Sequence, residues 1–254
     1  MEITMQKNLL AGSYPQQSLW KSIVLHILPG ALVALAFVAL KPFLDFSGYP
    51  PLLSFLLVVL VIDVPFMWGV MLYEGWKKDG RLSLNRVVLY REKVSWKRFL
   101  PVFVGAFIAA FLLVTLSNPL SEFFTSAVSS NLPKWIFLDE QSQYQIYARD
   151  ILIVIFVFQL VVTGIVLPWT EELYFRGYLL PRITRFGKWT PLIGGLLFGL
   201  YHIWQLFGFA SVFLLGTVLG FVVWWQRDVR LGISLHIISN VATRMMILIT
   251  VLQT

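Results

Sequence analysis

Residues 151–180 read ILIVIFVFQLVVTGIVLPWTEELYFRGYLL and place two adjacent carboxylates, Glu171 and Glu172, at the end of a strongly apolar run. The part before them is long enough to cross the ~30 Å hydrocarbon layer of a membrane as an α-helix. A charged side chain at membrane depth is expensive and usually has a function. The stretch therefore indicates a membrane helix with a candidate functional site at its end.

The same apolar pattern recurs along the chain. Of its 254 residues, 58% are hydrophobic and 13% are charged, which is about half the charged fraction of a soluble domain. The runs long enough to span a bilayer are residues 22–44, 51–73, 100–117, 151–170, 190–207, 210–226 and 231–252. We therefore expect an all-α protein, a polytopic membrane helix bundle of about seven (six to eight) transmembrane helices. Residues 1–254 are expected to form a single integral membrane domain.

Lys and Arg residues are concentrated in alternate connections between these helices. The richest connection holds Lys77, Lys78, Arg81, Arg86, Arg91, Lys93, Lys97 and Arg98, and the next two hold Arg176, Arg182, Arg185, Lys188, Arg227 and Arg230. Such asymmetry marks cytoplasmic loops. It predicts a cytoplasmic N-terminus and an exterior C-terminus, and it assigns the net charge of +7 to the membrane surface and not to a nucleic-acid partner. The small size and the lack of N-x-Ser/Thr sequons favour a prokaryotic plasma membrane.

The two carboxylates differ in their expected partners. Glu172 and Arg176 are four residues apart, so they share one face of a helix and can form an ion pair. Glu171 is five positions from Arg176 and points away from it. One carboxylate is thereby left free for chemistry. The alternative is that both acids only mark the cytoplasmic end of the helix.

Two other predicted helices carry histidines. In the run 190–207, His202 lies ~11 residues from the cytoplasmic end, and Phe198 precedes it by one turn. In the run 231–252, His236 and Asn240 are four apart and project to one side. Each of these polar groups could instead make a buried hydrogen bond between helices.

Taken together, these residues have catalytic potential. A carboxylate helped by an imidazole can deprotonate water, and an imidazole and an amide can donate to an oxyanion. By the predicted topology the groups lie in the cytoplasmic half of the bilayer, and their depths overlap if the helices tilt around a cavity that opens to the cytoplasm. Serine-type, zincin-type and aspartyl intramembrane proteases have no motif support, and the absence of cysteine excludes thiol chemistry.

Three motifs occur in order on predicted membrane helices. EExxxR occupies residues 171–176, FxxxH occupies 198–202 and HxxxN occupies 236–240. In this order they resemble the CPBP intramembrane proteases, also called the Abi or type II CAAX protease-like family, which includes the eukaryotic endopeptidase that trims prenylated CAAX proteins. The resemblance covers roughly residues 150–245, with no departure within the motifs. It implies a catalytic core at 150–250.

The resemblance implies a membrane-embedded endopeptidase. Glu171 and His202 would activate the hydrolytic water. His236 and Asn240 would form the oxyanion hole. The supporting residues would be Glu172, Arg176 and Phe198. The implied partners are a peptide or protein substrate, which can be lipid-modified, and membrane lipids.

We expect this site to work without a metal or cofactor. Two imidazoles and a carboxylate could also bind zinc with one open position. Asn240, however, is a natural oxyanion donor and a poor zinc ligand. The metal-free mechanism is therefore favoured, with a zinc site as the alternative.

Two other functions remain open from the sequence. The polar cluster could serve a non-catalytic membrane partner or immunity-type protein, or a proton-coupled transporter. The transporter is disfavoured because the polar groups gather toward one side of the membrane.

Asp63 and Arg244 lie near the middle of two predicted helices. An unpaired charge at that depth costs at least ~2.5–3.5 kcal/mol. We therefore predict that these two residues pair, directly or through water.

Overall fold

The computed structural model describes residues 14–129 and 146–253. Within these ranges the chain is helical, and its β-structure is one isolated bridge between Arg91 and Asp228. Among the described residues, six helices are long and apolar enough to cross a membrane. The prediction of an all-α membrane bundle is confirmed. The predicted single domain also includes residues 1–13, 130–145 and 254, which lie outside the described ranges.

The elements follow one another in this order. The first half contains α2 (Leu19–Phe46), α3 (Pro51–Val58), η1 (Val59–Asp63), α4 (Val64–Asp79), α5 (Trp96–Leu116) and α6 (Asn118–Ser129). The second half contains α8 (Arg149–Val161), η3 (Val162–Val166), α9 (Leu167–Glu171), η4 (Glu172–Leu179), η5 (Leu180–Trp189), α10 (Thr190–Tyr201), η6 (Ile203–Gly208), α11 (Phe209–Gln226) and α12 (Val229–Gln253). Of the η segments, η1, η3 and η4 are π-helices, whereas η5 and η6 are 3₁₀-helices.

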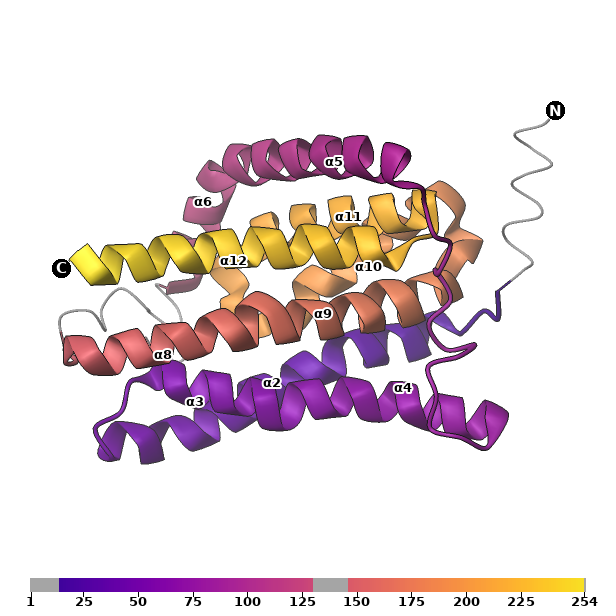
Figure 1. Ribbon diagram of the computed structural model, residues 1–254. Coiled ribbons are helices and arrows are strands. Elements are labelled where there is room, and N and C mark those ends of the chain that lie inside the picture. The colour runs from indigo at the N-terminus through magenta and orange to yellow at the C-terminus, as the bar shows by residue number, and fades with distance from the viewer. Residues whose placement is uncertain (1–13, 130–145, 254) are drawn as a thin grey trace.

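One of the six apolar helices contains two of the predicted spans. It runs from Arg149 to Tyr201, a length of 53 residues, and about 20 suffice to cross a bilayer. Its backbone leaves the helical region at Ile183 and Gly187. In Figure 1, α8 and α9 run to the right-hand end and α10 runs back from it. The described part of the chain therefore passes through the bundle about seven times, as predicted.

The predicted span 190–207 was too long. α10 ends at Tyr201, because the backbone of His202 (φ −80°, ψ 46°) no longer continues the α-helix. The 3₁₀-helix η6 follows, and Gln205 within it is also non-helical. His202 thus sits at a helix end and not within a helix.

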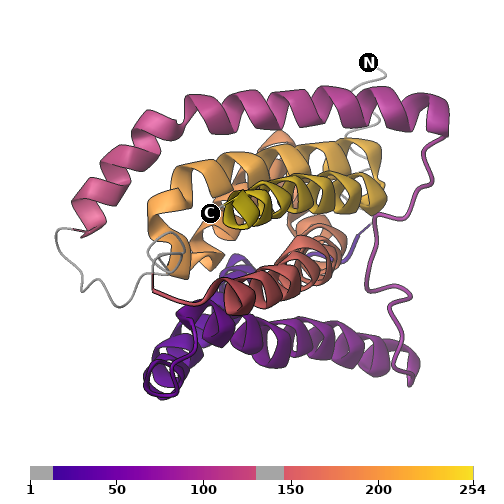
Figure 2. The ribbon, with the colours of Figure 1, turned by 60° about the vertical axis from the view of Figure 1, so that its left-hand side comes forward.

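The helices form layers (Figures 1 and 2). α5 covers one face, the α2–α4 segment covers the opposite face, and α8–α12 lie between them. The α4–α5 linker, η5 and the α11–α12 turn all lie at one end of the bundle. These are the connections rich in Lys and Arg. The alternation that the charge pattern predicted is therefore present in the fold.

α10 is held closely on two sides through glycines. A Cβ added at Gly30 of α2 would lie 1.9 Å from the carbonyl oxygen of Tyr201. A Cβ added at Gly195 of α10 would lie 2.7 Å from the backbone nitrogen of Thr217 in α11. Small residues let helix backbones approach in this way. The position of the end of α10, where His202 lies, therefore depends on these contacts.

The linker between α4 and α5 ties the second half of the chain together at the basic end. Leu89 N–H donates to Gly177 O in η4 at 2.9 Å, and Val229 N–H at the start of α12 donates to Tyr90 O at 2.9 Å. Val94 N–H donates to Asp228 Oδ2 at 3.0 Å. One loop thus fixes the ends of two helices that carry candidate site residues.

Candidate active site

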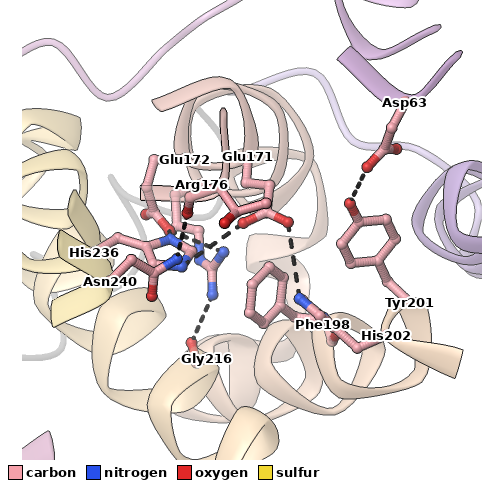
Figure 3. A network of polar contacts seen from close by, with 11 residues as sticks. Asp63, Glu171, Glu172, Arg176, Phe198, Tyr201, His202, Gly216, His236 and Asn240 are labelled. Carbon is pink, nitrogen blue, oxygen red and sulfur yellow. Dashed lines mark hydrogen bonds and ion pairs between the residues drawn. The ribbon is translucent and has the colours of Figure 1, made fainter. Parts of the chain in front are cut away.

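Three helices bring the candidate residues around one carboxylate (Figure 3). Glu171 ends α9, His202 follows α10, and His236 lies in α12. Glu171 Oε1 is 3.8 Å from His202 Nε2, and Glu171 Oε2 is 3.7 Å from His236 Nε2. The Glu171 side chain is only 2% exposed. A buried carboxylate therefore faces one imidazole with each of its oxygens.

The backbone around the two glutamates departs from the regular α-helix. α9 has five residues, and π-helices η3 and η4 flank it on both sides. π-Bulges shift the side chains that follow them around the helix axis and occur frequently at functional sites. Local helix geometry thus helps to turn Glu171 and Glu172 into the bundle, where both are buried.

One oxygen of Glu172 contacts both Arg176 and His236. Glu172 Oε1 is 3.0 Å from Arg176 Nη1 and 3.0 Å from His236 Nδ1. The predicted ion pair with Arg176 is confirmed, and the contact with His236 adds a link to α12 that helical spacing could not predict. Arg176 also donates from Nη2 to Gly216 O at 3.1 Å and lies over the ring of Phe198 at 4.0 Å.

Hydrogen bonds at the Nδ1 atoms orient both imidazoles. His202 Nδ1 donates to the carbonyl of Phe198 at 2.9 Å, one turn earlier in α10. His236 Nδ1 donates to the Glu172 carboxylate. These bonds hold each ring with its Nδ1 atom away from Glu171, so that both Nε2 atoms face the carboxylate. In a neutral ring that Nε2 atom carries a lone pair and accepts.

Asn240 of α12 faces the helical segment that leads to Glu171. Its Nδ2 donates to the carbonyl of Thr163 in η3 at 3.0 Å. An amide NH₂ has two hydrogens, so one remains for another acceptor. All four predicted catalytic residues therefore lie on the elements that surround Glu171, and Figure 3 shows Asn240 beside His236.

Sequence reasoning missed Tyr201 and assigned a different partner to Asp63. Among the described residues, the one that donates to Asp63 is Tyr201, whose Oη lies 2.5 Å from Oδ2, and no direct ion pair joins Asp63 to Arg244. The predicted pairing through water stays a prediction. Tyr201 immediately precedes His202, but in the sequence nothing distinguishes it from an ordinary core tyrosine. The pairing joins helices that are 138 residues apart along the chain, which is why no local spacing predicts it.

His26 illustrates the structural alternative for a membrane histidine. Its ring donates from Nδ1 to Ser22 O at 2.7 Å, one turn earlier in α2, and packs against Phe175 with 5.4 Å between ring centroids. Both contacts are typical of a satisfied core side chain. His26 therefore packs against Phe175, and no contact with Glu171 is found among the described residues.

Within residues 14–129 and 146–253, no group of three or more His, Asp or Glu side chains is arranged to hold a metal ion. Glu171 does contact two histidines, but it shares them with Glu172 and the Phe198 carbonyl. The expectation of a metal-free site remains a prediction.

Comparison with known proteins supports the resemblance. Residues 153–242 match the family described as type II CAAX prenyl endopeptidase Rce1-like. The matched segment contains all seven of the candidate residues. No curated protein and no solved structure matches the chain. The predicted resemblance to the CAAX protease-like family is thus confirmed over residues 153–242, and the matching family is one of proteases.

Proposed function

We propose that this protein is an intramembrane endopeptidase of the glutamic type. Glu171 and His202 activate a water molecule, and His236 and Asn240 stabilise the oxyanion. The observation that carries the proposal is the buried Glu171 carboxylate, held between two imidazoles at 3.8 and 3.7 Å. Because the match with the endopeptidase family includes these residues, the geometry and the family point to the same site.

Water activation follows from the orientation of the acceptors. With Nδ1 of His202 donating to Phe198 O, its Nε2 can accept one water hydrogen while Glu171 accepts the other. A water held by two acceptors presents its oxygen lone pair to a peptide carbonyl. Glu171 takes the proton as general base and returns it to the leaving amine.

Oxyanion stabilisation requires donors on the opposite side of the carboxylate. Asn240 has one Nδ2 hydrogen beyond the one that Thr163 O accepts. For His236 to donate from Nε2, its ring must carry both protons, because the Nδ1 hydrogen goes to Glu172. We propose that the Nε2–H of His236 and the second Nδ2 hydrogen of Asn240 together donate to the oxyanion.

We propose that the substrate is a peptide or protein segment at the membrane, because the matching family is described as a type II CAAX prenyl endopeptidase. An apolar cavity of about 700 Å³ lies between α5, α10 and α11, with Ala106, Leu192 and Phe221 among its lining residues. It offers space for a lipid chain on the substrate. We further propose that the site opens to the cytoplasm of a prokaryotic cell.

The test uses purified protein and an internally quenched peptide that ends in a CAAX sequence, in prenylated and unprenylated forms. We expect the wild type to cleave the prenylated peptide, with the same rate in a metal chelator. Glu171→Gln should lower kcat by at least about 10³-fold, since the general base and the water position are both lost. Glu122→Gln, an exposed residue of α6, is the matched control.

Two results would contradict the proposal. Full activity of Glu171→Gln would remove this residue from the mechanism, and loss of activity in the chelator would favour a zinc enzyme. If no peptide is cleaved and the cellular phenotype survives the double substitution Glu171→Gln and His202→Ala, a non-catalytic binding protein becomes the better explanation. Proton flux in liposomes would indicate a transporter.

A further inference from the structure

Asp63 is buried deep in the bundle on an element that none of the three motifs includes. It ends the π-helix η1 and is 0% exposed. Its Oδ2 accepts from Tyr201 at 2.5 Å, and its Oδ1 has no hydrogen-bond partner among the described residues. None of the ion pairs within those residues includes Asp63. A carboxylate at membrane depth is costly without a cation, so Asp63 requires a proton or strong donors.

Tyr201 stands between Asp63 and Glu171. Its hydroxyl donates to Asp63 (Figure 3), and it is also close enough to Glu171 for the two groups to interact electrostatically. A phenol has one hydrogen and can also accept. The hydroxyl can therefore donate to only one carboxyl group at a time, and it accepts from the other only when that group holds a proton. In the structure the hydrogen goes to Asp63, and Glu171 Oε1 has no hydrogen-bond donor among the described residues.

A second contact fixes this arrangement next to Glu171. Trp68 of α4 donates from Nε1 to Thr170 Oγ1 at 3.2 Å, and its ring meets the ring of Trp169 edge-on with 5.8 Å between centroids. Trp68 lies about one turn beyond Asp63, and Thr170 precedes Glu171. The helix that carries Asp63 is thus docked directly onto the helix that carries the proposed base.

We propose that Asp63 and Tyr201 are positioning residues for Glu171, and that the Tyr201 hydroxyl lets the two carboxyl groups share one proton. This inference rests on the proposed function of Glu171 as the base. The proton that Glu171 takes from water can pass to Tyr201 Oη while the original Tyr201 hydrogen passes to Asp63. Only O–H bonds are broken and formed, and the reverse transfer returns the proton to Glu171 for the leaving amine.

The sharing of a proton between Asp63 and Glu171 depends on all the charged or titratable side chains that face Glu171. These groups are Asp63 from η1, Tyr201 and His202 at the end of α10, His236 from α12, and Glu172 and Arg176 from η4. Arg176 and His236 are already engaged by Glu172. Asp63 is therefore the group whose proton can respond to Glu171 without breaking an ion pair.

Infrared titration tests the sharing without any substrate. The C=O stretching band of protonated carboxyl groups is followed against pH in detergent-purified protein, and Glu171→Gln assigns the contribution of Glu171. In the wild type we expect two coupled steps that belong to the Asp63–Glu171 pair. Asp63→Asn, which keeps size and shape, should leave a single Glu171 step displaced to lower pH by about one unit or more, since the competing acid is gone.

Tyr201→Phe separates coupling through the hydroxyl from simple charge repulsion. It keeps the ring contacts of Tyr201 and removes only Oη. In this background we expect the displacement caused by Asp63→Asn to fall below half of its wild-type value. Asp150→Asn, at an exposed position in the first turn of α8, is the matched control and should move no step. A Glu171 step that stays at its wild-type pH in Asp63→Asn overturns the proposal, as does an equal displacement with and without Tyr201.

The pH dependence of kcat/KM for the prenylated peptide gives the second readout. Its acid limb should move to lower pH in Asp63→Asn by the same amount as the infrared step. A purely structural role would instead lower the rate equally at every pH. If the wild type cleaves no peptide, the proposed function fails, whereas the infrared titration still decides whether Asp63 and Glu171 share a proton.

Discussion

At the residue scale, two adjacent buried glutamates differ in how closely a cationic side chain approaches them. Glu172 is fully buried and bound to Arg176 at 3.0 Å. Glu171 is equally buried, but its described ion-pair partners are the rings of His202 and His236, at distances longer than a hydrogen bond. One position therefore contributes to stability, whereas its neighbour holds a buried carboxylate that the fold does not fully compensate.

This difference predicts opposite effects of the same substitution. Glu172→Gln leaves the Arg176 guanidinium buried without its anion, which should lower the free energy of unfolding by about 3 kcal/mol or more. Glu171→Gln should leave that free energy close to the wild-type value, because it removes an incompletely paired acid. Thermal unfolding of both variants in detergent measures the difference. Equal losses of stability at the two positions would contradict this account of the site.

At the element scale, π-helices occur at three places where polar groups face the interior of the bundle. η1 ends at Asp63, η3 contains Thr163, whose carbonyl binds Asn240, and η4 begins with Glu172. A π-helical turn changes the rotation of the residues that follow it. Helices that would otherwise show an apolar face to their neighbours can thereby turn a few polar groups toward one another.

The close contact between α2 and α10 gives an element-scale prediction. In Gly30→Ala, the new methyl group would collide with the carbonyl of Tyr201 at 1.9 Å, so the end of α10 must move. We expect a loss of about 1–3 kcal/mol in stability and a fall in kcat, because Tyr201 and His202 move together. The measurements are thermal unfolding and peptide cleavage.

The control for this prediction is a second helical glycine. A Cβ at Gly69 of α4 would have no atom within 4 Å, so Gly69→Ala should be neutral or slightly stabilising. Unchanged stability and activity in Gly30→Ala would show that the spacing of α2 and α10 does not set the geometry of the site.

At the scale of the whole molecule, Asp228 joins the α4–α5 linker to the start of α12 at the basic end of the bundle. This carboxylate accepts from Val94 N–H at 3.0 Å and from Arg230 through Nε at 2.9 Å and Nη2 at 2.5 Å. It also accepts from the Arg230 backbone at the start of α12, as a helix N-cap does. Burial acts to raise the pKa of Asp228, but the hydrogen bonds from Arg230 and Val94 outweigh it and hold the pKa below its ordinary value.

A lowered pKa in the folded state predicts the pH dependence of stability. Asp228 stabilises the fold above the unfolded-state pKa of about 3.9, and this contribution is lost as pH falls through the lower folded-state value. Asp228→Asn should reduce the free energy of unfolding by about 1–2 kcal/mol at pH 7 and by less near pH 3. Melting temperatures at both values test this. Glu92→Gln, at an exposed position of the same linker, is the control, and an equal loss for Asp228→Asn at both pH values would refute the role of its charge.

Much of this molecule follows from its sequence. Apolar runs of spanning length determine the helical membrane class, because a backbone without water must satisfy its own hydrogen bonds. The spacing of four residues determines the pair of Glu172 and Arg176, since that spacing places them on one helix face. The three motifs predict the resemblance that the match over residues 153–242 supports, and they indicate the residues whose catalytic roles remain predictions.

Only the tertiary structure decided which groups meet between helices. The helical repeat sets direction around one axis, but it says nothing about the register of one helix against another. That register depends on close contacts such as Gly30 against Tyr201 and on the π-helical turns. It places Asp63 against Tyr201 where the sequence suggested Arg244, and it ends α10 just before His202. The sequence therefore determined the membrane helices and their local pairs, whereas packing between helices decided the surroundings of Glu171.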